Sequence, residues 1–394
     1  MIKLFKNAKV YAPNNLGKND VLVVGDKIAK IHPNIESEPF FYDENVVEIV
    51  EADGLILIPG LIDCHVHLLG GGGEGGYKTR TPELMLSDLI LGGTTTVVGC
   101  LGTDGVTRSM ESLVAKAYGL REEGVSAYVY SGSYRLPLTT ITGSIQKDIM
   151  MVEPIIGIGE IAISDHRSAS PTFEELAKAA SDARVGGILS GKSGLVNIHL
   201  GDGKDMMRYL FEMRTRTELP YTQFLPTHAN RNQVLFEEAI RYAKEGGFID
   251  FTTSTVPQFV KEGEIPAASA FCRCLEEGVN ATQITFSSDG QGSLPNFDKH
   301  GTLIGLDIGK TTSLYETLKT LVVEMNRPID EALMPVTVNP ATLLKLSRKG
   351  KIETGFDADL VLIDQSNMEI HSVYALGQTM MRNGVLIKKG TFEK

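Results

Sequence analysis

Short hydrophobic runs recur along the middle of the chain, and each is followed by a more polar stretch with helical periodicity. Eight such runs can be marked, at residues 61–67, 94–102, 126–133, 155–164, 195–201, 224–230, 248–255 and 284–290. Because β-branched residues fill the runs, they predict strands. Eight strand and helix units in series predict an α/β fold, a closed (β/α)8 barrel of the TIM type.

The stretches between these runs carry signals for helix starts. Thr172 and Glu175 have the spacing of a capping box, and Thr81 stands before a proline as a candidate N-cap. A third amphipathic helix is expected from Asn230 to a pair of glycines at 246 and 247.

Both ends of the chain have a different pattern, made of short strands and turns. The first reads "IKLFKNAKVY" and "VLVVGDKIAKI", and the last contains "ADLVLID" and a hairpin signal, "RNG", at 382–384. We expect the two ends to pair into a small β-sandwich side domain. The predicted division is 1–58 (side domain), 59–350 (barrel) and 351–394 (side domain).

Polar residues that can bind metal fall at the ends of the predicted barrel strands, where barrel enzymes carry their catalytic groups. The first run ends in His65 and His67, which share one face because they are two residues apart. The later runs supply the other candidates, Glu160, His199, His228 and Asp289.

A lone histidine in a strand is more often a hydrogen-bonded core residue than a ligand. Here four of the eight histidines fall on strand ends of one face, which favours a metal site. The other four are interpreted as surface residues or as partners of the site: His32, His166, His300 and His371. Imidazoles and carboxylates without thiolates suit Zn, Mn, Fe or Co. Six ligands fit two metal ions about 3.5–4 Å apart, joined by a carboxylate and a hydroxide.

Composition narrows the class of protein. The formal charge of −11 argues against nucleic acid as a partner, because phosphate contacts need clustered Lys and Arg. The four cysteines are too sparse for a disulfide framework and are interpreted as small apolar residues. No signal-peptide core and no run of 18 uncharged apolar residues occur, so we expect a cytoplasmic protein that does not contact membranes.

Five motifs carry a family resemblance. "PGLIDCHVH", followed by His199, His228 and "SSDG", resembles the amidohydrolase superfamily. Within it, the chain resembles the isoaspartyl dipeptidases through "HVHLLGGGGEGG", "CLGTDG", "ISDHRS", "THANR" and "SSDGQGSLP", in this order. The resemblance covers nearly the whole chain. It implies hydrolysis of the β-aspartyl bond in dipeptides with an N-terminal isoaspartate.

The resemblance also implies a role for each residue of the site. His65, His67 and Asp289 would hold the more buried zinc ion, and His199 and His228 the second. Tyr134 would polarise the scissile carbonyl, and Asp289 would transfer the proton. Glu74 would bind the substrate's α-amino group. The remaining substrate contacts would come from Gly72, Thr103 and Ser293 at the α-carboxylate and from Arg167 and Arg231 at substrate carboxylates. The family further implies a homo-oligomer, with an octamer as one candidate assembly.

One position departs from the superfamily's usual pattern. Glu160 stands where a carboxylated lysine usually bridges the metals, and no lysine occurs between Lys147 and Lys178. A glutamate offers the same bridging group on a shorter stem. A degraded site is the alternative, but a random loss would rarely leave a carboxylate, so we favour a functional substitution.

Other readings use the same residues. A cyclic amidase of the dihydroorotase or hydantoinase type would keep the metals, but its substrate has no free α-amine for Glu74. A deaminase usually needs one metal, and a non-enzymatic scaffold needs none. Tyr134 could be a packing residue, and Arg167 and Arg231 could be ion-pair partners on the barrel rim.

Overall fold

The computed structural model describes residues 2–36, 47–297 and 303–394. His300 and residues 37–46 of the predicted side domain lie outside the described residues.

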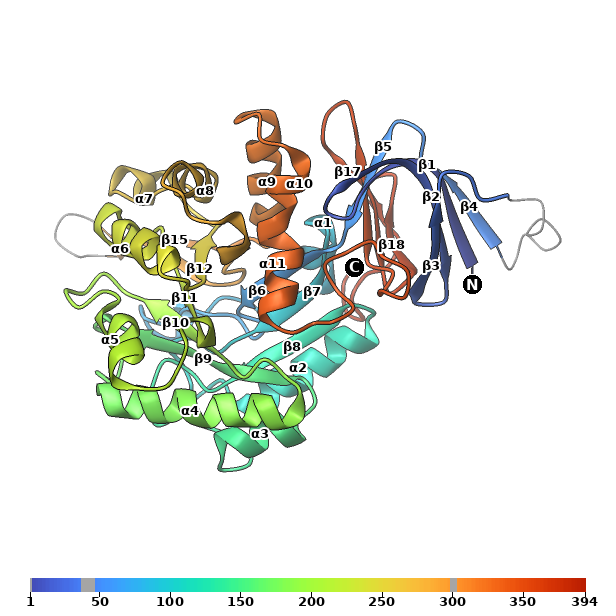
Figure 1. The fold of residues 1–394 in the computed structure, drawn as a ribbon. Coiled ribbons are helices and arrows are strands. Elements are labelled where there is room, and N and C mark those ends of the chain that lie inside the picture. The colour runs from blue at the N-terminus through green and yellow to red at the C-terminus, as the bar shows by residue number, and fades with distance from the viewer. Residues whose placement is uncertain (1, 37–46, 298–302) are drawn as a thin grey trace.

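Each of the eight predicted runs contains a strand, and the strands are parallel. Six form one curled sheet in the spatial order β11-β10-β9-β8-β7-β6, and two more form the pair β12-β13 (Figure 1). Their bounds are β6 Leu61–Val66, β7 Thr94–Gly99, β8 Ser126–Ser131, β9 Ile155–Ile163, β10 Leu195–Leu200, β11 Phe224–Thr227, β12 Ile249–Thr252 and β13 Ile284–Ser287.

Short links join the pair to the sheet at both sides. The amide of Ala229 donates to the carbonyl of Asp250 beside β11 and β12, and the amide of His67 donates to Gly290 beyond β13. Every residue of seven of these strands is buried, and β8 has two half-buried residues. This is expected for parallel strands that are covered on both faces.

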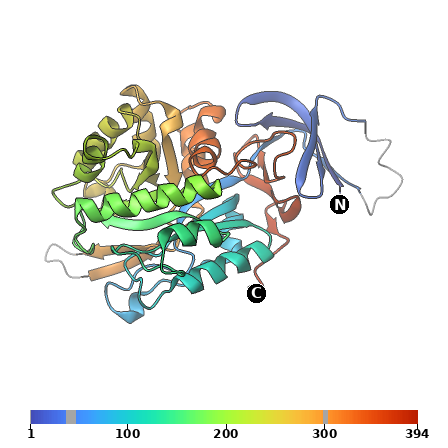
Figure 2. The same ribbon diagram turned by 60° about the horizontal axis from the view of Figure 1, so that its bottom comes forward.

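Helices follow the strands and cover them, with α3 and α4 lying against β8–β10 (Figures 1 and 2). The helices are α1 Leu86–Leu91, α2 Met110–Glu122, α3 Ile145–Met151, α4 Phe173–Ser190, α5 Arg208–Arg216, α6 Gln233–Lys244, α7 Pro257–Lys261, α8 Ala267–Glu276, α9 Ser313–Val323, α10 Ile329–Leu333 and α11 Val338–Leu343. Short 3-10 turns occur at Tyr77–Thr79, Tyr221–Gln223, Ala281–Gln283 and Met334–Val336, and a hairpin is formed by β14 Ser293–Phe297 and β15 Leu303–Ile308.

The structure corrects two of the three predicted helix starts. The capping box of Thr172 and Glu175 is confirmed at the start of α4. The helix expected from Asn230 begins at Gln233, and its N-cap is Asn232. Thr81 is not an N-cap, because α1 begins later, after Met85. The hydroxyl of Thr81 instead hydrogen-bonds the backbone of the glycine loop, as described below.

Strands from both ends of the chain share one nine-stranded sheet, seen as blue and red strands side by side in Figure 1. Its strands are β1 Ile2–Tyr11, β2 Asn15–Val24, β3 Lys27–His32, β4 Val47–Glu51, β5 Leu55–Pro59, β16 Leu360–Asp364, β17 Ile370–Ala375, β18 Gln378–Arg382 and β19 Val385–Leu386. The two ends meet where β5 and β16 pair antiparallel. The hairpin predicted at "RNG" is confirmed by the pairing of β18 with β19. The sandwich form of this region and the three domain boundaries stay predictions.

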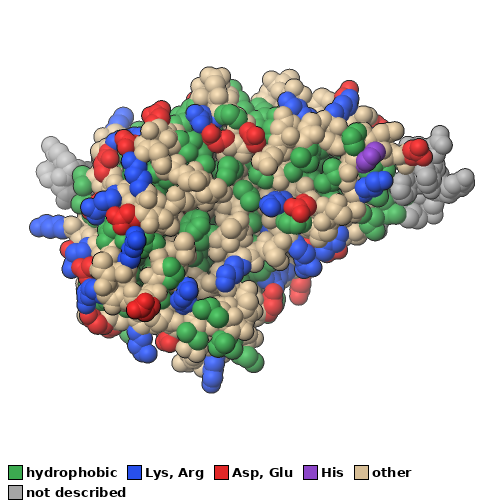
Figure 3. All heavy atoms as spheres, viewed as in Figure 1, with side chains coloured by type: hydrophobic (Ala, Val, Ile, Leu, Met, Phe, Trp, Pro, Cys, Tyr) green, Lys and Arg blue, Asp and Glu red, His purple; other side chains and the backbone are tan. Residues whose placement is uncertain are grey.

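The surface and the helices add two observations. On the face drawn in Figure 3, basic side chains are interspersed with acidic ones and do not gather in one basic patch. Across residues 2–36, 47–297 and 303–394, no helix has both the length and the apolar character needed to cross a bilayer.

Candidate active site

The six predicted metal ligands converge at the carboxyl ends of the parallel strands. His65, Glu160 and His199 lie within β6, β9 and β10, while His67, His228 and Asp289 follow strand ends by one or two residues. The four histidines and Glu160 are at most 6% exposed, so no bulk water solvates them. His228 and Asp289 have left-handed backbones, with φ of 62° and 52°, a conformation that non-glycine residues adopt at a cost and often at functional sites.

Glu160 lies between two pairs of histidines. Its Oε1 is 2.7 Å from Nδ1 of His199 and 3.2 Å from Nε2 of His228. Its Oε2 is 3.5 Å from Nε2 of His65 and 3.9 Å from Nε2 of His67. Each oxygen therefore faces a different pair, which is the arrangement of a carboxylate that bridges two cations.

Asp289 faces the pair formed by His65 and His67. Its Oδ1 is 3.0 Å from Nε2 of His67 and 3.6 Å from Nε2 of His65. Burial by itself would raise the pKa of Asp289, but the imidazoles of His67 and His228 lower it to about 2. Burial likewise opposes ionisation of Glu160, yet His65 and His199 hold its pKa well below the ordinary value. Both carboxyl groups are thus ionised at neutral pH.

Two buried oxygens of this cluster fit a metal site. Oε2 of Glu160 and Oδ1 of Asp289 have no well-aligned hydrogen bond from any described residue. A buried carboxylate oxygen without a donor is costly, and a cation among the facing ring nitrogens would satisfy it. The donor set of imidazoles and carboxylates is the one that zinc and related ions prefer. The residues present therefore fit two divalent ions.

The second ring nitrogen of each of three histidines is held by a polar side chain. Nδ1 of His65 lies 3.0 Å from Oδ1 of Asn197, and Nδ1 of His228 lies 2.6 Å from the Thr252 hydroxyl. Nε2 of His199 lies 2.9 Å from Oδ2 of Asp165. Such contacts fix the orientation of a ligating imidazole.

These partners were not identified from the sequence. Asn197 could have been found, because it lies two residues before His199 on the same face of β10. Asp165 stands within the "ISDHRS" motif without having been assigned a role. Thr252 gave no signal of its own.

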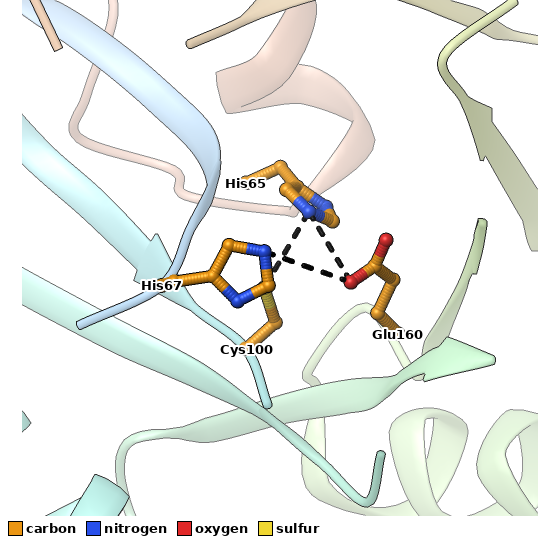
Figure 4. A group of neighbouring side chains, drawn as sticks. All are labelled: His65, His67, Cys100 and Glu160. Atoms are coloured by element: carbon orange, nitrogen blue, oxygen red, sulfur yellow. Dashed lines mark hydrogen bonds and ion pairs between the residues drawn. The ribbon is translucent and has the colours of Figure 1, made fainter. Parts of the chain in front are cut away.

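All four cysteines were interpreted as small apolar residues, but the thiol of Cys100 contacts two of the metal-ligand candidates. Its Sγ lies 3.5 Å from Nε2 of His65 and 3.8 Å from Nδ1 of His67. Figure 4 shows the Cys100 side chain beside the two imidazoles. Its donor atom and those of His65, His67 and Glu160 all lie within 4.8 Å of one another.

A cavity of about 470 Å³, its open mouth included, lies directly above the ligands. It brings together all seven predicted substrate contacts, Gly72, Glu74, Thr103, Tyr134, Arg167, Arg231 and Ser293, with His67, His199 and Asp289 at its floor.

Glu74 is the acidic group that the glycine loop carries into this cavity. Its Oε1 accepts a hydrogen bond from the Thr103 hydroxyl at 3.1 Å and one from Nη1 of Arg167 at 3.3 Å. Arg167 also forms a two-pronged pair with Asp165, with distances of 3.0 and 2.7 Å. Asp165 therefore fixes the Arg167 guanidinium and the His199 ring together.

The glycine loop has a defined backbone. Gly70 and Gly72 have φ of 74° and 68°, and a Cβ on either would lie 2.3 and 2.7 Å from the carbonyl oxygens of Thr81 and Thr79. Only glycine fits both positions. The Thr81 hydroxyl accepts from the amide of Gly71 at 2.7 Å and donates to the carbonyl of Gln291 at 2.6 Å.

Tyr134 lies at the edge of the metal ligands. Its hydroxyl is 2.9 Å from Nδ1 of His199, and the residue is 5% exposed. Burial and the nearby Glu160 carboxylate hold the pKa of Tyr134 well above its usual value. The phenol therefore stays protonated and can donate a hydrogen bond.

Comparison with known proteins agrees with this geometry. The chain matches the family model named Amidohydrolase family over residues 56–388. It is 48% identical to a β-aspartyl dipeptidase from Fervidobacterium islandicum, solved in complex with the β-Asp-Leu dipeptide, with a TM-score of 0.91 and 100% coverage of both chains.

More distant relatives have other names. A dihydroorotase from Lactococcus lactis is 24% identical, over 96% of this chain and 92% of the relative. A dihydropyrimidinase from Brevibacillus agri is 17% identical, with a TM-score of 0.65 and full coverage of both chains, which shows a shared fold. Since the family match spans residues 56–388 and includes every metal-ligand candidate, the chain belongs to the amidohydrolase family.

Proposed function

We propose that this protein is a binuclear metal-dependent β-aspartyl dipeptidase, which hydrolyses the isopeptide bond of dipeptides with an N-terminal isoaspartate. The observation that carries the proposal is the position of Glu160. It offers one oxygen to each of two histidine pairs, directly below a cavity that contains Glu74. The 48% identical relative with β-Asp-Leu in its title supports the substrate class.

The proposed metals are two zinc ions. His65, His67 and Asp289 would hold one, His199 and His228 the other, and Glu160 would bridge them in place of a carboxylated lysine. When bound, such ions polarise a carbonyl oxygen and lower the pKa of water, so that a nucleophile is available at neutral pH.

The chain's own residues would then orient and protonate the substrate. The neutral phenol of Tyr134 donates to the scissile carbonyl oxygen and stabilises the negative charge that develops there. Asp289 is ionised, lies at the floor of the cavity and can accept a proton from the attacking water. It then returns that proton to the leaving amine.

Recognition of the isoaspartate end would come from the glycine loop and its neighbours. The Glu74 carboxylate would pair with the substrate's α-ammonium group, and Gly72, Thr103 and Ser293 would contact its α-carboxylate. Arg167 and Arg231 would face the substrate's carboxylates, since a guanidinium can bind a carboxylate through two hydrogen bonds. In an α-linked aspartyl peptide the α-carboxyl group forms the peptide bond and the side-chain carboxylate is free. The free carboxylate and the scissile carbonyl therefore exchange places relative to the α-amino group, and they do not fit this arrangement.

Two further features belong to the proposal. The eight parallel strands would close into a (β/α)8 barrel through the links beside β11–β12 and β13–β6. The active form would be a homo-oligomer, as the family resemblance implies.

A paired assay of the zinc-loaded protein on β-aspartyl-leucine and α-aspartyl-leucine tests the function. We expect cleavage of the β isomer alone, with no dependence on added bicarbonate because no lysine needs to be carboxylated. Glu160→Gln should lose bound metal and activity, while the exposed control Glu153→Gln should keep both. A fully active Glu160→Gln protein would refute the bridging role.

The alternative is a cyclic amidase, favoured by the 24% identical dihydroorotase. Hydrolysis of dihydroorotate or a hydantoin, together with no cleavage of either dipeptide, would establish that activity instead. Glu74 argues against it, because a cyclic amide has no free α-amine for this carboxylate to bind.

A further inference from the structure

Cys100 follows β7 directly and lies beside the HxH pair on the neighbouring strand. Its backbone amide donates to the carbonyl of Val66 at 3.0 Å, so the residue is in register with His65 and His67. The side chain is 1% exposed and points into the ligand cluster (Figure 4).

The free nitrogen of His65 faces this thiol. Nδ1 of His65 is occupied by Asn197, so Nε2 is the nitrogen left for a metal. That Nε2 is 3.5 Å from Sγ of Cys100 and 3.5 Å from Oε2 of Glu160. In a tetrahedral zinc site with bonds of 2.0–2.3 Å, neighbouring sulfur and nitrogen donors lie about 3.6 Å apart. The distance from Sγ to Nε2 therefore matches that of two neighbouring donors on one metal ion.

We propose that Cys100 is an additional ligand of the more buried metal, beside His65, His67, Asp289 and the bridging Glu160. This inference rests on the metal centre of the proposed function and adds a sulfur donor to it. A bound thiol gives up its proton, so the ligand is a thiolate. Sulfur donors favour zinc and cobalt over manganese or magnesium. The site would thus be selective for borderline-soft ions.

Cys64 provides a contrast within the same barrel interior. It is also fully buried, on the strand that carries His65, but its Sγ contacts Oδ1 of Asp250 at 3.5 Å and the carbonyl of Phe286 at 3.9 Å. Without a metal, the Cys100 thiol can hydrogen-bond the Val66 carbonyl at 3.6 Å or the ring nitrogens of His65 and His67 at 3.5 and 3.8 Å. A neutral thiol making one of these weak hydrogen bonds is the alternative that the experiment must distinguish.

Cobalt substitution tests the inference without turnover. The metal-free full-length protein is titrated with Co²⁺, and its near-ultraviolet absorption is followed for the charge-transfer band of a cobalt–thiolate bond. We expect the band in the wild-type protein and in the control Cys64→Ser. We expect no band in Cys100→Ser or Cys100→Ala, and weaker binding of one cobalt ion by about 10–100-fold, as for lost contacts around a metal.

The possible results separate the two proposals. If two cobalt ions bind to the wild-type protein without the band, or if Cys100→Ala keeps the band and the affinity, Cys100 is not a ligand while the metal centre stands. If no cobalt binds to the wild-type protein, the metal centre fails, and the sulfur ligand fails with it. Circular dichroism of both Cys100 variants shows whether each is folded, and Cys100→Ser preserves the volume if Cys100→Ala does not fold.

Discussion

The guanidinium of Arg108 donates to the carbonyl oxygen of Gly71 at 2.7 Å. The same side chain donates to the carbonyl of Leu69 at 3.1 Å and to that of Gly72 at 3.3 Å. Arg108 is 4% exposed and comes from the loop after β7, so a second βα loop fixes the backbone of the glycine loop that carries Glu74. The shape of the substrate cavity thus depends on a residue that has no proposed contact with the substrate.

Replacing Arg108 by lysine should impair catalysis without removing metal. A lysine ammonium cannot reach three carbonyls in the fixed directions of a guanidinium. A loop displaced by about 1 Å can cost about 100-fold in rate. We expect kcat/KM for β-aspartyl-leucine to fall about 10–100-fold with metal content unchanged. Arg184→Lys, whose guanidinium bonds Gln223 away from the cavity, is the control. A variant within twofold of wild type would show that the loop holds its shape without Arg108.

Glu74→Gln should weaken recognition of the α-amino group. A hydrogen bond between charged groups contributes about 1.5–3 kcal/mol, so kcat/KM for β-aspartyl-leucine should fall about 10–100-fold. N-succinyl-leucine is the same substrate without the amino group, and on it the variant and the wild-type protein should be equal. Glu83→Gln, an exposed acid paired with Lys116, should change neither rate. Equal losses on both substrates would mean that Glu74 only shapes the loop.

Tyr134→Phe should lower kcat and leave KM nearly unchanged. The phenol is expected to act on the charge that develops in the transition state, and loss of one such donor costs about 100–1000-fold in kcat. Tyr130→Phe is a matched control, because this buried tyrosine on β8 donates to the carbonyl of Cys64 and does not line the cavity. If kcat of Tyr134→Phe stays within threefold of wild type, the tyrosine is a packing residue.

Metal removal should destabilise the folded protein. A ligand that binds only the native state adds about 2.7 kcal/mol when present at 100 times its Kd. We therefore expect chelation to lower the thermal midpoint measured by circular dichroism, and zinc to restore it. Glu160→Gln should show a smaller shift. Identical midpoints with and without chelator would contradict a tightly held metal.

Lys349→Met should lower stability without affecting the site. The ammonium group is buried, 2.5 Å from Asp359 and 2.9 Å from Asp357, and it also reaches the Ser126 hydroxyl on β8 at 2.6 Å. The variant leaves the buried Asp359 carboxylate without its cation, whereas Asp357 keeps Lys27 at 2.5 Å. Breaking a buried ion pair in this way should cost about 3–5 kcal/mol in a denaturant titration. Lys351→Met replaces a partly exposed lysine outside this cluster; it is the control and should cost less than about 0.5 kcal/mol.

The destabilisation by Lys349→Met should depend on pH in a defined direction. Burial alone would raise the pKa of Asp357, but Lys349 and Lys27 hold it below the ordinary value of 3.8. A carboxyl group with a lowered pKa contributes stability above its unfolded pKa and loses it as pH falls through the folded value. The difference between variant and wild type should therefore shrink below about pH 4. A constant difference down to pH 2 would show that packing, not charge, explains the loss.

The residue pattern alone predicts the series of eight strands and the metal-ligand candidates. Strand periodicity places His65 and His67 on one face. Parallel strands bring their carboxyl ends together, so the residues at the ends of the runs meet independently of how the helices pack. The same local logic found the capping box of Thr172 but failed at Thr81. There, hydrogen bonds to Gly71 and Gln291, 210 residues away in the chain, replaced a helix start.

The groups that support those ligands are found only from the three-dimensional contacts. Cys100 looks like any apolar residue in its run, and its distance to His65 depends on the register between β6 and β7. Arg108 has no signal in its own loop, because its partners are carbonyl oxygens, which every residue has. Contacts made by backbone atoms and across strands are set by register and loop shape, and neither is encoded in a pattern of residue types.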